Sequence, residues 1–236
     1  MGERPLIDTA RARTQHEAYQ RLLEDAGYDV RVVAADEACP DCPFVEDTAV
    51  VLDTVAIATR PGAPARRGEV AAVAAELERL KPVRTIEGPG TVDGGDVLRI
   101  GDTLYVGRST RTNDAGIEQL GAIAADDGLR VVAVPVRGVL HLKSAAAQLD
   151  EATVLVARDC IDPEVFAGYR LIDKAPGEEH LASVLRLASG RLVMTTTAPH
   201  TRQRLQEHGY APDVIDSSEF QAADGGLTCL SILIDD

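Results

Sequence analysis

The sequence predicts an α/β protein built as a five-bladed α/β propeller, which is a ring of repeated β-β-α-β units. Three observations lead to this prediction: a short strand motif recurs along the chain, a tight turn precedes most copies, and helical periodicity follows. A single unit cannot bury both faces of its sheet, so several units are expected to pack side by side and close into a ring. An open mixed α/β sheet is the alternative that the same pattern allows.

The recurring motif is the second strand of a predicted hairpin. Its copies are residues 54–57, 103–106, 153–156 and 191–194, at intervals of 49, 50 and 38 residues. Turn residues such as Asp53 and Ser189-Gly190 stand before them, as a hairpin requires. The first strands are expected at 50–52, 97–100, 145–149 and 184–187.

Helical segments follow the hairpins. Apolar residues recur at helical spacing over 66–80 and 114–126, and a shorter helix is expected at 200–208. Asp162 before Pro163 is typical of a helix start. Third strands are expected at 83–86, 131–134, 169–172 and 214–215. A fifth unit combines a helix at 11–25 and a strand at 30–33 with a C-terminal strand at 230–234, and no linker divides the chain, so residues 1–236 are expected to form one domain.

The composition excludes some classes of partner. Acidic residues outnumber basic ones 38 to 24, the formal net charge is −14, and aromatic residues make up only 3% with no Trp. Such a field repels nucleic acid and anionic membranes, and few aromatic faces are present to stack bases. A small cationic substrate is therefore the expected partner, with no nucleic acid and no membrane.

The cysteines indicate a reducing compartment. Four cysteines are too few for a disulfide framework in 236 residues, and no apolar run reaches the roughly 18 residues of a membrane helix. We therefore expect a cytoplasmic protein. Cys39 and Cys42 have the spacing of metal or redox sites, but no second pair completes a zinc set, so no metal is expected.

Unusual polar residues stand at or just before the first strand of successive units. They are Asp41, Glu46 and Asp47 in the first unit, Asp93-Gly94-Gly95-Asp96 in the second, His141 in the third, and Gly225-Gly226 with Cys229 near the C-terminus. Equivalent ends of the units in a ring face one axis, so these residues are expected to converge on one pocket. Together they supply the groups for nucleophilic catalysis on a cationic substrate.

Within this set, Cys229 is the candidate nucleophile, because a thiolate attacks an electrophilic carbon well. The alternative is a small buried strand cysteine. His141 is the candidate general acid and base, oriented by Asp93. The alternative is a hydrogen-bonded core histidine, and His180, in the similar run His180-Leu181-Ala182-Ser183, competes for the role.

Several separate motifs, in the right order, resemble the dimethylarginine dimethylaminohydrolase family. That family belongs to the guanidine-modifying superfamily with the five-bladed pentein fold, alongside arginine deiminases and amidinotransferases. The segments that carry the resemblance are PDCPFVEDTAVV (40–51), TRPGAPARR (59–67), DGGDVL (93–98), RTN (111–113), HLKS (141–144) and GLTCLS (226–231).

The resemblance implies hydrolysis of N-omega-methylated arginines to citrulline through a covalent thiouronium intermediate, with no metal or organic cofactor. Cys229 would attack the guanidinium carbon, and His141, held by Asp93, would protonate the leaving amine and then activate water. The guanidinium nitrogens would be bound by Asp41, Glu46 and Asp47. Arg66 and Arg111 would hold the carboxylate of the amino acid.

The residue pattern after the histidine bears on the substrate. Arginine deiminases carry His-x-Asp, whereas this chain has His141-Leu142-Lys143, which favours a methylated arginine over arginine. An arginine deiminase or an amidinotransferase-like enzyme remains the alternative activity. Discrimination by a methyl-sized pocket is about 1–3 kcal/mol, so activity on monomethylarginine is also expected.

The N-terminus departs from the family pattern. Family members usually begin with a strand and a substrate-covering loop before the segment that resembles Arg4–Asp8, where this chain begins. We therefore expect the last blade to lack a strand, with an exposed edge that invites pairing into a homodimer. A non-catalytic protein that binds methylarginines without a lid is the second alternative.

Overall fold

The computed structural model describes residues 6–178 and 182–234 of the chain. Within these residues, the strands form four three-stranded sheets with one shared topology. In each sheet the first strand pairs antiparallel with the second, and the second pairs parallel with the third. A helical crossover joins the second strand to the third. The predicted β-β-α-β repeat is thus confirmed.

The first two units have the following bounds: β1 (Ala49–Val51), β2 (Ala56–Ala58), η2 (Pro64–Glu69), α2 (Val70–Leu77), β3 (Val83–Thr85), β4 (Val97–Ile100), β5 (Thr103–Arg108), α3 (Asp114–Ala124), η4 (Ala125–Asp127) and β6 (Arg130–Pro135). The next two comprise β7 (Ala146–Asp150), β8 (Thr153–Val156), η5 (Pro163–Phe166), β9 (Arg170–Asp173), β10 (Val184–Arg186), β11 (Leu192–Thr195), α5 (Pro199–Glu207) and β12 (Asp213–Ile215). The predicted strands agree with these bounds to within about two residues.

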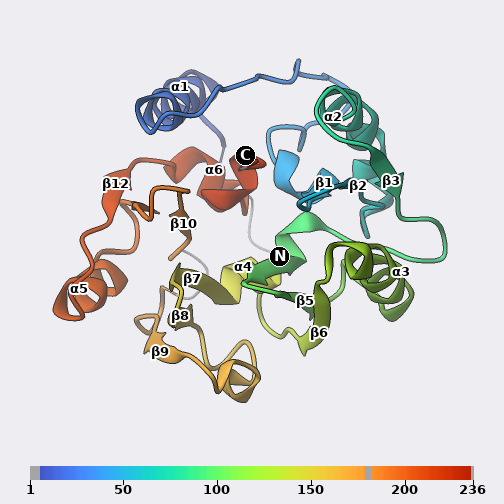
Figure 1. The fold of residues 1–236 in the computed structure, drawn as a ribbon. Coiled ribbons are helices and arrows are strands. Elements are labelled where there is room, and N and C mark those ends of the chain that lie inside the picture. Colours follow the sequence, from blue (N-terminus) through green and yellow to red (C-terminus); the bar gives the residue numbers. More distant parts are fainter. Residues whose placement is uncertain (1–5, 179–181, 235–236) are drawn as a thin grey trace.

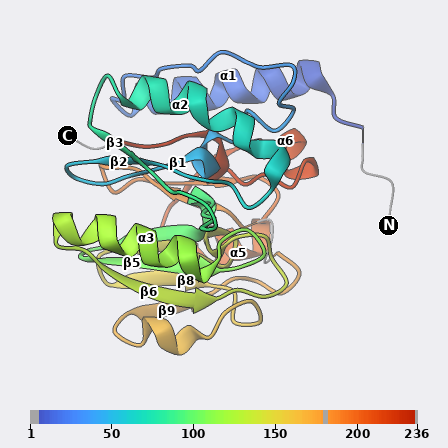
Figure 2. The same cartoon turned by 90° about the vertical axis from the view of Figure 1, so that its right-hand side faces the viewer.

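The four units follow one another around an axis. Figure 1 looks along this axis and shows the first strands nearest the centre, with α2, α3 and α5 on the outside. Seen from the side in Figure 2, α3 runs roughly along the axis of the ring. Neighbouring units share their cores: Leu52 of the first unit lies in one cluster with Leu104 and Leu120 of the second. The mixed α/β architecture of a propeller is therefore confirmed.

The fifth sector differs from the prediction. It contains α1 (Thr9–Asp25), which contacts α6 (Ser218–Ala222), but the expected strands at 30–33 and 230–234 do not form a ladder among the described residues. Their apolar side chains still pack, since Val33 and Ile232 lie against the cluster around Ala56. Arg4 and Pro5, which belong to the segment compared with the family N-terminus, lie outside the described residues.

Helix starts follow from local hydrogen bonding. The Asp8 carboxylate accepts hydrogen bonds from two backbone N–H groups in the first turn of α1, and the Asn113 side chain accepts one from Gly116 N in α3. Asp162 caps the turn that begins with Pro163, as its position in the sequence indicates. Each cap satisfies backbone donors that the helix itself leaves unpaired.

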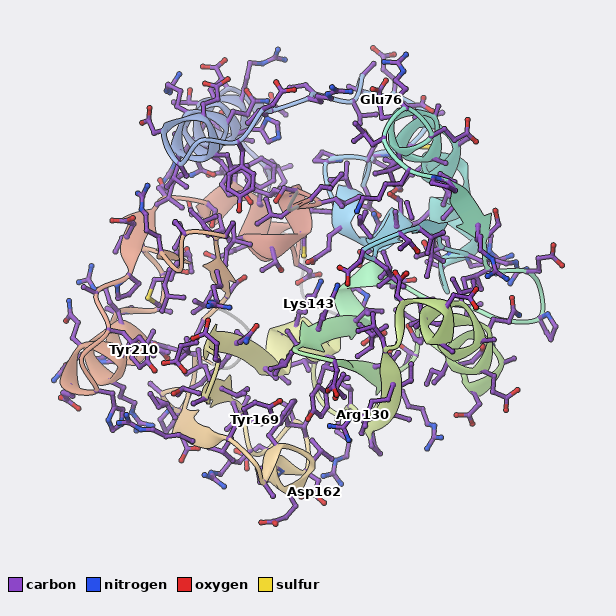
Figure 3. All side chains as sticks on the ribbon, viewed as in Figure 1. Glu76, Arg130, Lys143, Asp162, Tyr169 and Tyr210 are labelled. Carbon is purple, nitrogen blue, oxygen red and sulfur yellow. The ribbon has the colours of Figure 1, made fainter. Side chains whose placement is uncertain are left out.

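The inner strands line an open cavity of about 250 Å³ on the axis of the ring, which we call the axial cavity. Strands β1, β4, β7 and β10 and the C-terminal segment line it. At one end lies the ion pair between Lys143 Nζ and Glu46 Oε1, 2.8 Å apart. Figure 3 shows Lys143 near the centre of the ring, whereas Glu76, Asp162 and Tyr210 lie at its periphery.

Among the described residues, no helix has both the length and the apolar character needed to span a membrane.

The packing between units predicts that alanine substitution of two leucines, Leu120 and Leu80, affects the stability of the protein differently. Leu120 is fully buried in the shared core, whereas the Leu80 side chain is 47% exposed. Leu120→Ala is expected to lower the free energy of unfolding by about 2–5 kcal/mol, because it removes buried methylenes and leaves a cavity. Urea titration followed by circular dichroism measures this change. Leu80→Ala is the control and should shift the free energy by less than about 1 kcal/mol; equal losses in both variants would contradict the shared core.

Candidate active site

Single helical turns stand at the same end of the inner strands. They are η1 (Val45–Thr48) before β1, η3 (Gly94–Asp96) before β4 and α4 (Leu142–Ala145) before β7, and η6 (Thr228–Leu230) joins them from the C-terminal region. These turns carry the polar residues singled out in the sequence. The structure brings Glu46, His141 and Cys229 together in the lining of one small pocket.

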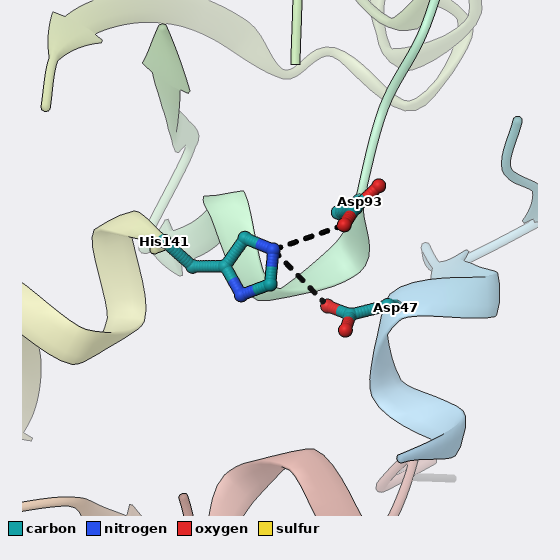
Figure 4. Close-up of side chains that lie close together, drawn as sticks. All are labelled: Asp47, Asp93 and His141. Carbon is teal, nitrogen blue, oxygen red and sulfur yellow. Dashed lines mark hydrogen bonds and ion pairs between the residues drawn. The ribbon is translucent and has the colours of Figure 1, made fainter. Parts of the chain in front are cut away.

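His141 is held between two carboxylates. Its Nε2 lies 3.0 Å from Asp93 Oδ2 and 3.8 Å from Asp47 Oδ1, and all three side chains are buried. Figure 4 shows the two carboxylates converging on this one nitrogen from η1 and η3. The expected contact between His141 and Asp93 is therefore present, and Asp47 joins it.

The charges around His141 favour the imidazolium. Burial by itself lowers the pKa of this group, but Asp47, Asp93 and Asp96 outweigh burial and raise the pKa to about 9. Burial alone would raise the pKa of Asp93, but the hydrogen bond and charge of His141 bring that pKa below its usual value. Both shifts indicate that His141 is protonated and Asp93 is deprotonated at neutral pH, with Nε2–H donating to Asp93.

Gly95 makes this approach sterically feasible. A Cβ there would lie 2.7 Å from Asp47 Oδ1 and 2.8 Å from His141 Nδ1. Gly95 N also donates a hydrogen bond to Asp47 Oδ1, at 2.9 Å. Gly225 lies against a different residue, because a Cβ there would overlap the ring of Phe44.

Cys229 is a free thiol at the edge of this pocket. Its sulfur accepts a hydrogen bond from Gly226 N at 3.3 Å, which holds the loop before η6 in a tight turn. Burial and the negative charges of Glu46 and Asp47 raise the pKa of the thiol well above its ordinary value. Without a bound cation, the thiol is therefore expected to stay protonated at neutral pH.

Arg66 lies elsewhere than expected. Its guanidinium is buried, pairs with Asp47 Oδ2 and with Glu69, and donates to the carbonyl oxygen of Phe44 at 2.9 Å. Burial lowers the pKa of this group, and Glu69 and Asp47 reverse that effect and raise it. In this arrangement Arg66 supports Asp47 from behind instead of facing the pocket.

Three buried side-chain polar atoms have no hydrogen-bond partner among the described residues, and two of them, other than Arg186 Nε, bear on ligand binding. Glu46 Oε2 is one, since only its Oε1 is engaged by Lys143; Arg111 Nη1 is the other. Arg111 lies close enough to Asp93 to lower its pKa. Asp41 is exposed beside this region, and its backbone carbonyl lies 3.4 Å from Arg66 Nη2.

Three other residues belong to the site, and one candidate cannot be placed. Asp96 accepts a hydrogen bond from the residue after His141, and Ser183 and Lys143 line the pocket, although the sequence motifs indicate no catalytic or binding role for any of the three individually. For Asp96, its place in the Asp-Gly-Gly-Asp motif is the signal that was available. His180, the competing histidine, lies outside the described residues.

The cluster of Asp47, Asp93 and His141 also has the size of a cation site, because its donor atoms lie within 4.8 Å of one another. The His141 nitrogen that would bind a cation is the one that faces both carboxylates. A proton on that nitrogen offsets negative charge of the two carboxylates, so we interpret the cluster as a site for a proton.

Curated relatives cover most of the chain. The protein named N(G),N(G)-dimethylarginine dimethylaminohydrolase from Streptomyces coelicolor is 44% identical over 232 residues, which is 98% of this chain and 88% of that protein. The protein of the same name from Pseudomonas aeruginosa is 37% identical over 227 residues, 95% of this chain and 89% of its own length. A scan against protein-family models finds no match.

Solved structures agree with these relatives. A variant of the Pseudomonas aeruginosa enzyme complexed with citrulline superimposes with a TM-score of 0.90 at 35% identity, covering 97% of this chain and 90% of that one. The N-terminal domain of a cyanobacterial arginine dihydrolase has a TM-score of 0.87 at 17% identity, covering 96% and 87%, and so shares the fold. The ring of β-β-α-β units and the pocket with cysteine, histidine and carboxylates place this protein among the pentein-fold proteins. Within that class, the chain belongs to the dimethylarginine dimethylaminohydrolase family.

The electrostatics of the pocket predict the reactivity of Cys229. Iodoacetamide is a neutral reagent that reacts with thiolates. Its reaction with Cys229 is expected to be slow at pH 7 and to become fast only at a pH above the usual range of thiol pKa values. Site-resolved mass spectrometry across pH measures it, with Cys229→Ser to identify the site. Glu46→Gln removes one of the opposing charges and should speed the reaction at neutral pH. Half-maximal alkylation at or below about pH 8.5 in the unaltered protein would contradict this electrostatic description.

Proposed function

We propose that this protein hydrolyses N-omega-methylated L-arginines, asymmetric dimethylarginine and monomethylarginine, to L-citrulline and dimethylamine or methylamine. The observation that carries the proposal is the common pocket of Cys229 and His141, with the imidazole held by Asp93 and Asp47. The curated relatives named for this reaction support it.

Binding of the cationic guanidinium activates the thiol in this proposal. The negative charges of Glu46 and Asp47 hold the pKa of Cys229 high in the free protein. A guanidinium placed beside them neutralises that field, so the pKa falls and the thiolate forms next to the carbon that it attacks. The substrate charge thus couples recognition to nucleophile formation.

The reaction then follows in two halves. The Cys229 thiolate forms a bond to the guanidinium carbon, and His141 donates a proton to the departing dimethylamine as the C–N bond breaks. Because both carboxylates engage Nε2, His141 Nδ1 is the nitrogen that exchanges this proton. Water, deprotonated by the same imidazole, attacks the thiouronium carbon, and the C–S bond breaks to give citrulline and the free thiolate.

Two of the unpartnered polar atoms match the two ends of the substrate. Glu46 Oε2 is an acceptor for a guanidinium N–H, and Arg111 Nη1 is a donor for the carboxylate of the amino acid. We propose that Arg111 binds the carboxylate, that Asp41 and Asp47 contribute negative charge to the guanidinium site, and that Arg66 holds Asp47 in place. When the substrate forms hydrogen bonds with Glu46 Oε2 and Arg111 Nη1, it removes the free-energy cost of leaving these buried groups without a partner.

Lys143 provides a reason for a preference for methylated substrates. It occupies Glu46 Oε1 at 2.8 Å and leaves one oxygen of that carboxylate for the substrate. Unsubstituted arginine would bring more N–H donors than this pocket can accept, whereas a dimethylated nitrogen has no N–H to satisfy.

We further propose that the protein acts in the cytoplasm, in line with its free thiols, and that it forms a homodimer.

The proposed substrate preference predicts an order of turnover. Citrulline release is expected to be fastest with asymmetric dimethylarginine or monomethylarginine and at least about tenfold slower with arginine. A colorimetric citrulline assay measures this, and Cys229→Ser should release none from any substrate. Faster turnover of arginine would make the protein a deiminase, and calorimetric binding without citrulline would make it a binding protein.

The raised pKa of His141 predicts how activity depends on pH. The imidazolium is the acid that protonates the leaving amine, so kcat, measured at saturating substrate that has already activated the thiol, should fall as pH rises through about 9. Steady-state rates from pH 6 to 10 measure this limb. His141→Ala should lose about two to four orders of magnitude in kcat. Loss of activity around pH 6.5, the ordinary value for histidine, would contradict the role of the surrounding carboxylates.

A further inference from the structure

Asp96 is a fully buried carboxylate next to the catalytic candidates that the proposed reaction does not use. It lies at the end of η3, three residues after Asp93. Burial raises its pKa above the ordinary value, and the charge of His141 together with hydrogen bonds from Ser109, Thr112 and Leu142 offsets only part of that effect. Taking a carboxylate fully out of water is strongly unfavourable unless such contacts compensate it, so its contacts indicate a specific role.

One oxygen of Asp96 fixes the segment that carries His141. Leu142 N donates a hydrogen bond to Asp96 Oδ1 at 2.9 Å, between elements far apart in the sequence. Leu142 directly follows His141 and begins α4. The bond therefore sets where the imidazole stands relative to Asp93, because Asp93 and Asp96 belong to the same turn.

The other oxygen fixes the segment that carries Arg111. Ser109 Oγ donates to Asp96 Oδ2 at 2.6 Å and accepts hydrogen bonds from Arg111 N at 2.9 Å and Thr112 N at 3.2 Å. Thr112 Oγ in turn accepts a hydrogen bond from Asp93 N at 3.1 Å. The hydroxyl of Ser109 thus relays the position of Asp96 to the backbone of Arg111.

The neighbouring strand is shaped to admit this carboxylate. A Cβ on Gly107, in β5, would lie 2.3 Å from Asp96 Oδ1 and 3.0 Å from the Cβ of Leu142. Only a glycine lets the strand pass this close to the bond between Asp96 and Leu142 N. Backbone and side chains of three segments therefore converge on one carboxyl group.

We propose that Asp96 is a positioning residue that holds His141 through Leu142 N and Arg111 through Ser109, so that proton transfer and carboxylate recognition share one anchor. This inference rests on the proposed function for its catalytic meaning. The groups that face or surround His141 are Asp47 from η1, Asp93 and Asp96 from η3, Cys229 from η6, and the pair of Lys143 and Glu46 at the pocket wall. Removing the Asp96 charge leaves the others in place.

The test compares Asp96→Asn with Asp102→Asn, a matched loss of one carboxylate on an exposed side chain at the far end of the same hairpin. A proton NMR titration of the His141 imidazole in each variant reports the surroundings of the imidazole without any substrate. In Asp96→Asn the pKa should fall by about one unit or more, because a neighbouring negative charge is lost and the imidazole is no longer held against Asp93. It should stay unchanged in Asp102→Asn.

Steady-state kinetics with asymmetric dimethylarginine provide the second measurement. Asp96→Asn should lower kcat at least tenfold and also raise KM, whereas Ser109→Ala should raise KM several-fold with little change in kcat. A folded Asp96→Asn protein with an unchanged His141 titration and unchanged kcat would overturn the proposal. If Asp96→Asn does not fold, Ser109→Ala decides, and an unchanged KM there overturns it.

The titration separates failure of this inference from failure of the proposed function. If the unaltered protein turns over no methylarginine, the proposed function fails, and the effect of Asp96 on the pKa of His141 still supports or overturns the positioning role.

Discussion

A buried imidazolium among carboxylates is the interaction on which the site depends. His141 carries a positive charge because Asp47, Asp93 and Asp96 surround it, and Asp47 in turn is balanced by Arg66. Removing one partner from a buried ion pair leaves an uncompensated charge and costs about 3–5 kcal/mol. Each buried charge in the pocket is therefore tolerated only while its oppositely charged partners are present. The pairing of these charges determines how the turns that carry them pack together.

The ring supplies the geometry that this set requires. Because the units share one topology, the turn before each inner strand lies at the same end of the axis. Asp47, Asp93 and His141 come from three successive units, and Cys229 comes from the C-terminal region. Each unit thus contributes a short turn with one or two polar side chains, while its sheet and helix form the shared apolar cores.

Local patterns in the sequence predicted the parts of the molecule that local rules determine. Alternation and turn residues located the hairpins, and the shared position of polar residues before the inner strands predicted their convergence. The strands at 30–33 and 230–234 were predicted wrongly, because apolar periodicity reports burial and not backbone pairing. Their side chains are packed as expected, but a ladder is missing from the described residues.

Other features depend on contacts that leave no local signal. The motif around Arg66 identifies an arginine near the site, but which carboxylate it meets depends on how two units pack. The close approach of Gly225 to Phe44 joins segments that lie far apart in the sequence. The hydrogen bonds of Asp96 reach backbone groups, which any residue type supplies, so the partners cannot be inferred from their identity.

The fifth sector, whose expected strands form no ladder in the part of the chain that the structure describes, has a consequence for the nucleophile. His141 and Asp93 stand on turns that lead directly into hydrogen-bonded sheets, whereas the segment after Cys229 is held by side-chain packing. Backbone amides outside a ladder open at lower free energy than those within one. Hydrogen exchange around Cys229 should thus be governed by small local openings, so that the half of the pocket bearing the thiol yields to a ligand while the half bearing the imidazole stays in place.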